Sequence, residues 1–150
     1  MKITVASDHA GYELKKIIEE HLTSLGHEVI DGGAQTSDEP FSYVVAGQKV
    51  CDDILSSGAD RGIAICGTGI GISVVCNKHK GITCGVCTNE YMARMSRRHN
   101  DANVLAIGAR VVGKALALSM VDVFLEEEFA GERHGERVND LKAQEDRLFK

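Results

Sequence analysis

The sequence predicts a single α/β domain in which a doubly wound, parallel, five-stranded sheet carries helices on both faces. Short β-branched segments alternate with amphipathic segments along residues 1–150, and glycine-rich turns follow several of the apolar segments. No linker, internal repeat or low-complexity tract divides the chain. Because alternating strands and helices form βαβ units, the strands are expected to run parallel.

The expected strands and helices alternate from the first residues to the last. Apolar residues at 14, 17, 18, 22 and 25 recur at helical spacing, and Gly26 follows them as a helix-ending glycine does. The expected strands span residues 3–6, 27–31, 62–66, 82–86 and 103–107. The expected helices span residues 12–25, 43–57, 70–79, 89–98 and 112–125, and a last, charged helix over 132–150 lies on the surface or on a neighbouring subunit.

Composition excludes several classes of protein. The 17 basic and 22 acidic residues give a net charge of −5, and 5% aromatic content without tryptophan argues against a nucleic-acid partner. No apolar run reaches the roughly 18 residues that a bilayer span needs, and no signal peptide precedes the first strand. The five cysteines are spread through core segments, which suits a reducing compartment. We therefore expect a cytoplasmic protein without a membrane partner that binds a small polar or phosphorylated molecule.

The glycine-rich turn over residues 66–73, Cys-Gly-Thr-Gly-Ile-Gly-Ile-Ser, is the strongest functional signal. Alternate glycines let the main chain approach a ligand and aim successive N–H groups at an anion. The spacing differs from G-x-G-x-x-G and no lysine follows, so a nucleotide site is disfavoured. A tight strand-to-helix turn without a ligand needs the same glycines, and the motif alone supports this alternative nearly as well.

Cys66 stands at the end of a buried strand and directly before an expected helix, where the helix dipole stabilises a thiolate. A thiolate there can act as a nucleophile or as a base. For Cys51, Cys76, Cys84 and Cys87 we prefer the alternative of a small buried apolar side chain. Because residues three apart in a strand face opposite sides, Cys84 and Cys87 are not expected to share a metal or redox site.

Two further places carry candidate polar groups. His99 follows an expected helix end, whose negative dipole favours the imidazolium and makes it a candidate general acid, and Asn100 can orient a ligand hydroxyl. An ordinary capped helix end explains both residues equally well. Asp8 and His9 follow the first strand, where Asp8 can equally be a helix N-cap. Three other histidines are expected at the surface or in packing contacts: His21, His27 and His79.

Arg133 and Arg137 lie four residues apart, so on a helix they share one face and can grip a phosphate group. Glu132 and Glu136 interleave with them, which makes ion pairing in water a strong alternative. Three more arginines are candidate cations, the first two with surface ion pairing as the default: Arg97, Arg98 and Arg110.

Taken together, several ordered motifs resemble the type B ribose-5-phosphate isomerases. The matching segments are residues 7–11, 66–71, 97–105, 108–113 and 131–134, so the resemblance covers nearly the whole chain. The same superfamily includes galactose-6-phosphate isomerase subunits and allose-6-phosphate isomerases, and the presence of Cys66 together with His99 and Asn100 favours the ribose-5-phosphate branch. The resemblance implies interconversion of ribose 5-phosphate and ribulose 5-phosphate through an enediolate, without a metal or another cofactor.

The resemblance also assigns roles. Cys66 matches the base that removes the proton on C2, Thr68 the hydroxyl that moves protons between the sugar oxygens, and His99 the group that opens the sugar ring. Main-chain N–H groups over residues 67–73 would stabilise the enediolate. The implied substrate-binding residues, with His9 and the last two arginines on the phosphate, are Asp8, His9, Tyr43, Gly67, Gly69, Ile70, Gly71, Ser73, Asn100, Arg110, Arg133 and Arg137. A neighbouring subunit completes the family's active site, so a homodimer or tetramer is implied.

One segment departs from the family pattern. Residues 42–47 read Ser-Tyr-Val-Val-Ala-Gly where the family usually has Asp-Tyr-Pro, so only Tyr43 is kept and the substrate could be a six-carbon sugar phosphate such as allose 6-phosphate. Two other hypotheses stay open: a non-catalytic module that binds a phosphorylated ligand, and a thiol redox enzyme that uses Cys66. The leading hypothesis expects Cys66, Thr68, His99 and the paired arginines to meet at the ligand-binding end of one sheet.

Overall fold

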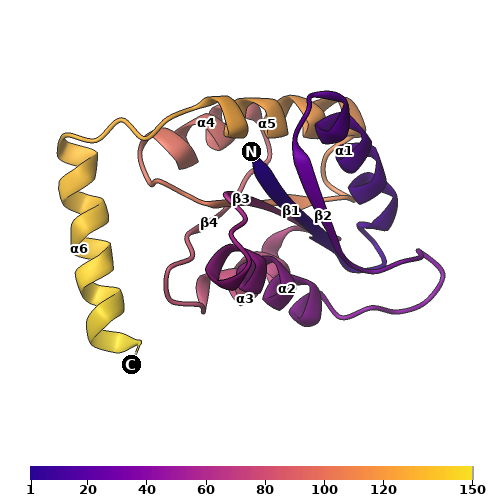
Figure 1. Cartoon of the computed structure of the whole chain (residues 1–150), viewed down its shortest axis with the longest axis horizontal. Helices are drawn as coiled ribbons and strands as arrows, with labels where there is room; N and C mark the ends of the chain where they lie inside the picture. The colour runs from indigo at the N-terminus through magenta and orange to yellow at the C-terminus, as the bar shows by residue number, and fades with distance from the viewer. Residues whose placement is uncertain (150) are drawn as a thin grey trace.

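Five parallel strands form one sheet in the computed structural model, which describes residues 1–149 (Figure 1). The strands are β1 (Lys2–Ser7), β2 (Glu28–Gly33), β3 (Arg61–Cys66), β4 (Cys84–Val86) and β5 (Val104–Gly108), in the spatial order β2-β1-β3-β5-β4. The predicted fold class is confirmed, and the observed strand ends lie within two residues of the predicted ones. The position of β5 between β3 and β4 was not predicted.

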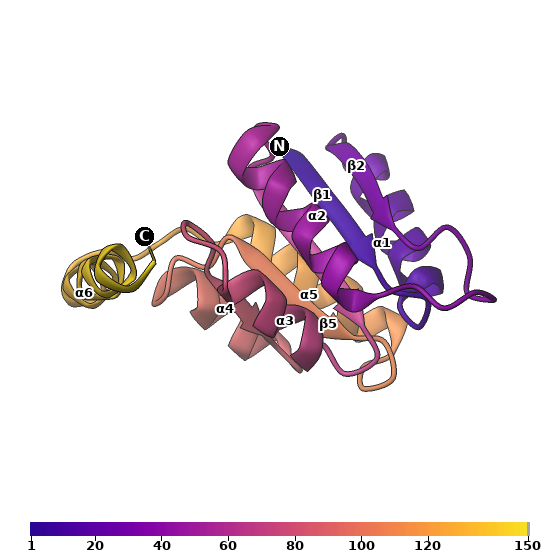
Figure 2. The ribbon, with the colours of Figure 1, turned by 90° about the horizontal axis from the view of Figure 1, so that it is seen from below.

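Helices cover both faces of the sheet (Figures 1 and 2). They are α1 (Tyr12–Ser24), α2 (Tyr43–Ser56), α3 (Ile70–Asn77), α4 (Glu90–Arg98) and α5 (Lys114–Glu126). Helices α1, α4 and α5 pack on one face and α2 and α3 on the other, which is the doubly wound arrangement. Local signals fix several helix ends: the Ser42 hydroxyl accepts the Val44 N–H at 3.1 Å at the start of α2, and Gly26 adopts φ +87° after α1.

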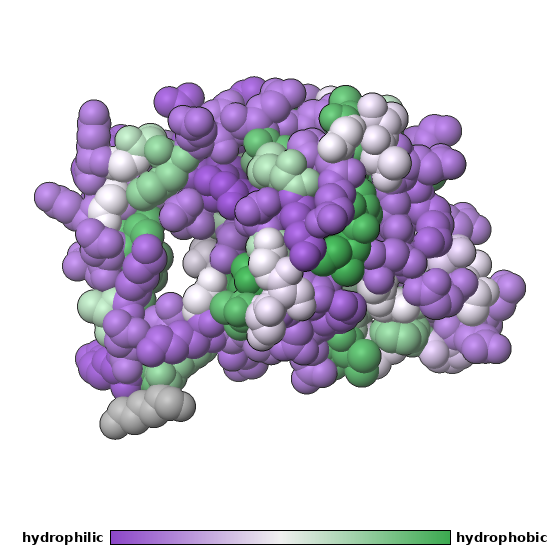
Figure 3. Space-filling view, in the orientation of Figure 1, coloured by the Kyte–Doolittle hydropathy of each residue, from purple (hydrophilic) through white to green (hydrophobic). Residues whose placement is uncertain are grey.

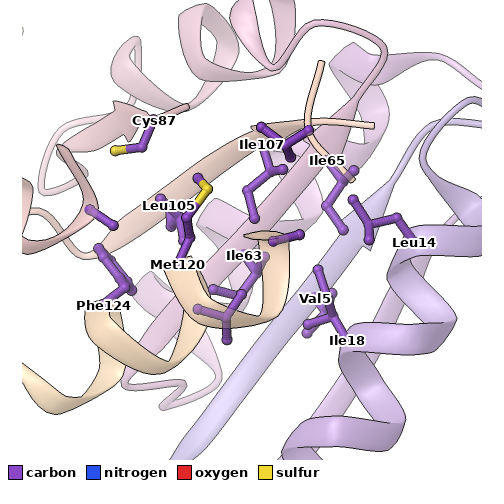
Figure 4. Close-up of a cluster of buried hydrophobic side chains, with 14 of the residues drawn as sticks. Val5, Leu14, Ile18, Ile63, Ile65, Cys87, Leu105, Ile107, Met120 and Phe124 are labelled. Carbon is purple, nitrogen blue, oxygen red and sulfur yellow. The ribbon is translucent and has the colours of Figure 1, made fainter. Parts of the chain in front are cut away.

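Two buried clusters result from the alternation of side chains along each strand. In β3, Ile63 and Ile65 point into the cluster under α1 and α5, whereas Ala64 and Cys66 point into the cluster under α2 and α3. Figure 4 shows the first cluster, where Ile63 and Ile65 lie among side chains from the helices and from neighbouring strands. Cys84 and Cys87 fall into different clusters, as predicted from their spacing of three.

The last helix, α6 (Arg133–Leu148), stands apart from the three-layer body (Figure 1). Near its C-terminal end, Glu145 accepts the Gly81 N–H at 2.7 Å and Asp146 pairs with Lys80 at 2.9 Å. A hollow of about 370 Å³ separates α6 from the body, and Figure 3 shows it as an opening. Leu141 lines this hollow and is 53% exposed, so the inner apolar face of α6 is incompletely covered within one chain. Among the described residues, no helix combines the length and apolar character needed to span a bilayer.

Arg97 corrects one prediction. Surface ion pairing was expected, but the side chain is buried, and its Nη1 donates to Asp101 Oδ1 at 3.0 Å and to the Ala102 carbonyl at 2.7 Å. Its Nε donates to the Glu127 carbonyl at 3.3 Å. The charged guanidinium can be buried because it donates hydrogen bonds to two main-chain carbonyls, Ala102 before β5 and Glu127 after α5. Arg97 therefore ties the loop after α4 to the end of α5, whereas its neighbour Arg98 stays at the surface, 4.0 Å from Glu127.

A charged cluster joins α1 to the end of β2. The fully buried Lys15 ammonium donates to the Gly32 carbonyl at 2.9 Å and pairs with Asp31 at 2.7 Å. Burial opposes ionisation of Asp31, but hydrogen bonds from Lys15 and Glu19 outweigh it and lower the pKa of Asp31 to about 2. Burial and the hydrogen bond to Asp31 raise the pKa of Glu19 to about 7. At neutral pH, Glu19 therefore holds the proton of this carboxyl pair for part of the time.

We expect Glu19 to make the fold less stable as the pH rises. The unfolded chain releases the Glu19 proton near the ordinary value of 4.5, whereas the folded chain keeps it until about 7, so the free energy of unfolding falls between these values. Glu19→Gln should remove this fall, so the difference in Tm between the variant and wild type should be a few degrees more favourable to the variant above about pH 7 than at about pH 5. Thermal unfolding at several pH values measures it, with the exposed Glu20→Gln as control. Equal pH slopes for wild type and Glu19→Gln would contradict the assignment.

Candidate active site

The candidate site begins where β1 and β3 end. The chain proceeds from β1 to β2 on one side and from β3 towards β5 on the other, so the loops after β1 and β3 diverge and leave a crevice between them. The Asp8 N–H donates to the Ile65 carbonyl at 3.2 Å, which holds the two strand ends together. Cys66 closes β3 and Asp8 follows β1, so both predicted residues lie at this crevice.

Cys66 joins an apolar cluster and a polar turn. The residue is 4% exposed, and its Sγ accepts the Gly69 N–H at 3.2 Å. Helix α3 begins one residue later, at Ile70, so the sulfur lies at a helix N-terminus. An amide N–H and the positive end of a helix dipole both stabilise negative charge on an atom that they face. The geometry thus supplies what a cysteine base or nucleophile needs.

The turn lies directly on the end of β5 because two glycines leave room for main-chain contact. Gly69 adopts φ +81°, and a Cβ there would lie 3.0 Å from the Gly108 nitrogen. A Cβ on Gly108 would lie 2.5 Å from the Thr68 carbonyl oxygen. Both distances are shorter than ordinary van der Waals contact, so side chains at 69 or 108 would push the turn away from the strand.

Some of the main-chain N–H groups predicted to bind a ligand, over residues 67–73, already donate hydrogen bonds within the chain, and others do not. The Gly69 N–H is bound to Cys66, and the Ile70 N–H donates to Thr68 Oγ1 at 3.2 Å. The Ser73 hydroxyl donates to the Ile70 carbonyl at 2.7 Å, so it stabilises the first turn of α3. The N–H groups of Gly71 and Ile72 belong to the first turn of α3, where no intrahelical acceptor exists. They are the donors available to a developing negative charge.

Two side chains lie against the turn, and a third, His9, follows the end of β1. The Arg110 side chain packs over Gly67, with its Nη1 3.2 Å from the place that a Cβ would occupy if residue 67 had a side chain. The Tyr43 ring packs over Gly71 in the same way, 3.0 Å from the place of a Cβ there. His9 Nδ1 lies 3.0 Å from the Phe41 nitrogen and 3.3 Å from the Phe41 carbonyl oxygen, so main-chain contacts hold the ring through that atom. We call the whole set the amide half-site: Asp8, His9, Tyr43, residues 66–73 and Arg110.

The other predicted residues lie at the opposite end of the sheet. His99 and Asn100 follow α4 and precede β5, and the Asn103 carbonyl accepts the N–H of Gly62 at the start of β3 at 2.9 Å. Gly62 pairs with Val104 and Cys66 with Gly108, a separation of four residues or roughly 13 Å along the strands. The expectation that Cys66, His99 and the paired arginines meet at one end of the sheet within a chain was therefore wrong.

A second group forms around His99. Its ring stacks on His134, with centroids 3.9 Å apart and planes inclined by 10°. The Ala130 N–H donates to the Arg98 carbonyl at 3.0 Å and brings the start of α6 against the end of α4. The exposed Arg133 and Arg137 flank His134 on α6. We call this set the imidazole half-site: His99, Asn100, Arg133, His134 and Arg137.

His134 was given no role by the sequence, although it lies in the matched segment 131–134. Its contact with His99 depends on the turn before α6, where Glu132 adopts φ +56°. A glutamate in a left-handed conformation cannot be recognised from residue type, because non-glycine residues adopt it rarely. The matched motif was the one signal that pointed to His134.

The remaining cysteines are buried and free. Burial raises the pKa of Cys87 to about 11, although a contact with Ser96 acts in the opposite direction. Contact with Cys76 and burial raise the pKa of Cys51 far above its ordinary value. These thiols are therefore poor nucleophiles. Among residues 1–149, no group of three or more His, Cys, Asp or Glu side chains is placed to hold a metal ion.

The chain is similar to a well-defined group of enzymes. The model of the ribose/galactose isomerase family matches residues 3–141. The chain is 45% identical over 146 residues to ribose-5-phosphate isomerase B of Escherichia coli, with 97% of each chain covered. It is 42% identical over 141 residues to the galactose-6-phosphate isomerase subunit LacA of Clostridium acetobutylicum, covering 94% of this chain and 97% of the subunit.

Solved structures that resemble this chain belong to the same group of enzymes. Ribose-5-phosphate isomerase B of Clostridium thermocellum superimposes with a TM-score of 0.95 at 52% identity, covering 98% of this chain and 99% of that one. The Mycoplasma genitalium enzyme, solved with bound ribulose-5-phosphate, gives a TM-score of 0.92 at 38% identity, covering 97% and 96%. These matches confirm the resemblance drawn from the motifs: the chain belongs to the ribose/galactose isomerase family.

Proposed function

We propose that the chain is a sugar-phosphate isomerase that interconverts ribose 5-phosphate and ribulose 5-phosphate. The observation that carries this proposal is the Cys66 sulfur held by the Gly69 N–H at the N-terminus of α3, beside unused main-chain donors. The relatives support the same substrate pair, since one of them, at 38% identity, was solved with bound ribulose-5-phosphate.

The residues of the amide half-site account for the proton transfers. The Cys66 thiolate takes the proton from C2 of the open-chain aldose, the C2–H electrons form a C1=C2 bond, and the carbonyl oxygen becomes negative. The N–H groups of Gly71 and Ile72 stabilise that charge where it develops. Thr68 carries the hydroxyl proton from O2 to O1, and the Cys66 thiol returns its proton to C1, which gives the ketose.

We propose that a second copy of the chain completes the site. Within one chain the two half-sites lie at opposite ends of the sheet, so a substrate held at Cys66 cannot reach His99. A twofold dimer can place the imidazole half-site of one copy against the amide half-site of the other, twice over. Apolar side chains beside the amide half-site support such an interface, since Val45, Ile70 and Val74 are 51%, 59% and 49% exposed.

In this dimer the residues take the roles that the resemblance implies. His99 opens the sugar ring, Asn100 and Asp8 bind hydroxyl groups, and the phosphate lies among His9 and the arginines of α6. Guanidinium forks and an imidazole N–H suit phosphate oxygens. The free thiols fit a cytoplasmic, reducing compartment.

A six-carbon sugar phosphate is the second candidate substrate. The LacA subunit at 42% identity belongs to an isomerase of galactose 6-phosphate, and Tyr43, which covers Gly71, lies in the segment that departs from the usual pattern. Comparison of kcat/KM for ribose 5-phosphate, allose 6-phosphate and galactose 6-phosphate decides between them. A higher value for either hexose phosphate would replace the five-carbon substrate in our proposal.

Replacement of the base should abolish turnover. We expect Cys66→Ala to lower kcat by about 10³-fold, because the C2 proton loses its acceptor, while KM changes little. The reaction is followed with ribose 5-phosphate in the presence of a chelator, and Cys87→Ala, in the other buried cluster, serves as control. Incorporation of deuterium at C2 in heavy water separates an isomerase from a module that only binds. Undiminished turnover of Cys66→Ala would remove the cysteine from this role.

The shared site should show complementation between inactive variants. Mixed dimers of Cys66→Ala and His99→Asn contain one intact site, so random pairing should restore about a quarter of the wild-type activity. Cys66→Ala mixed with Arg110→Ala is the matched control, because both residues belong to the amide half-site and every mixed site stays defective. Activity is measured after co-refolding, with mass spectrometry to confirm mixed dimers. Inactive mixed dimers of the first pair would contradict a site shared in this way.

The glycine contact should be needed for activity. Gly108→Ala places a methyl group 2.5 Å from the Thr68 carbonyl, so we expect a loss of about 1–3 kcal/mol in stability and at least about a tenfold loss in kcat as the turn shifts. Gly113→Ala is the control, since nothing lies within 4 Å of its Cβ position and its φ is −77°. Urea unfolding and turnover are measured together. Wild-type kcat in Gly108→Ala would show that the position of the turn is not critical.

A further inference from the structure

The stacked histidines of the imidazole half-site carry one more inference. The rings of His99 and His134 lie parallel at 3.9 Å, and both residues are half-buried. Two imidazolium ions at this distance repel each other strongly, so the pair holds one proton far more readily than two. The stack also fixes the plane of the His99 ring, because the His134 ring covers one of its faces.

The surroundings of His134 oppose a positive charge on its ring. Titratable and charged groups face it from three segments: His99 from the residue after α4, Arg133 and Arg137 from α6, and Glu132 from the turn before α6. Partial burial and the positive charge of His99, Arg133 and Arg137 lower the pKa of His134, and Glu132 opposes them only in part. A positive charge on His134 is therefore disfavoured beside a charged His99 ring.

We propose that His134 is a positioning residue for His99: it stacks on that ring, fixes its orientation and disfavours a second positive charge beside it. This inference rests on the proposed function, in which His99 opens the sugar ring. In that step the His99 proton goes to the ring oxygen, the C1–O4 bond breaks, and the proton of the anomeric hydroxyl goes to solvent. A doubly charged or unstacked pair would misplace the proton that the step requires.

Three substitutions at position 134 separate stacking from charge. His134→Phe keeps an uncharged flat ring, so kcat/KM for ribose 5-phosphate should stay within about threefold of wild type. His134→Ala removes the stack and should lower kcat/KM by at least about tenfold, and His134→Lys, which adds a fixed positive charge beside His99, should lower it further. Wild-type kcat/KM in folded His134→Ala, or an equal loss in His134→Phe and His134→Ala, would overturn the proposal.

A second measurement does not depend on turnover. Proton NMR of the histidine Cε1–H signals across pH 4–9 follows each ring in the full chain, a range that covers histidine titration. In His99→Phe, the pKa of His134 should rise by about 0.5 or more, because one of the positive charges beside it is gone, whereas His79→Phe should leave it unmoved. An unmoved His134 titration in His99→Phe would overturn the coupling. If the wild type is inactive on every sugar phosphate tested while this coupling is observed, the proposed function fails, but the coupling between the two stacked rings stands.

Discussion

The main-chain contact between Gly69 and Gly108 is the constraint on which the amide half-site depends. Since all strands are parallel, the turn after β3 must pass over the end of its neighbour β5, and there is room only for main chain. In that turn the Gly69 N–H donates to Cys66 Sγ, and α3 starts directly after it with unbound amides in its first turn. The thiol and its helix therefore receive their orientation from this backbone contact together with the packing of Cys66, Ile72 and Cys76 in the cluster under α2 and α3.

The fold of one chain also explains why the site is divided. A parallel sheet collects the ends of its strands at one end and their starts at the other, so a motif before β5 cannot lie beside a motif after β3. Arg97 reinforces this separation by tying the loop after α4 to the end of α5, from which the chain continues to α6. The dimer that we propose would convert the separation into a shared site and would cover the exposed apolar side chains of α2 and α3. In such a dimer, folding and catalytic competence are distinct steps, of which the second depends on protein concentration.

Much of the fold was predictable because it depends on local periodicity. Apolar spacing and strand-end glycines predicted each element to within two residues, and the spacing of Cys84 and Cys87 predicted their opposite faces. The order of the strands was not predictable, since periodicity says which residues are buried but not which strand lies beside them. Arg97 was misjudged for a related reason: one of its acceptors, the Glu127 carbonyl, lies 30 residues away. The motifs named most residues of the two half-sites, and the resemblance implied a neighbouring subunit, but neither predicted which residues lie together within one chain, because a resemblance groups residues by role and not by position in the sheet.

The five thiols show how environment rather than residue type decides the chemistry. Only Cys66 accepts a main-chain N–H at a helix N-terminus within the described residues. Contact with Cys51 acts to lower the pKa of Cys76, but contact with Cys84 and burial outweigh it, so that thiol stays protonated. A resolving cysteine must reach its thiolate form to attack an oxidised partner, and Cys76 is poorly suited to do so. The same sheet that orients Cys66 towards a substrate therefore withholds the second reactive thiol that a redox cycle needs, which favours proton transfer as its chemistry.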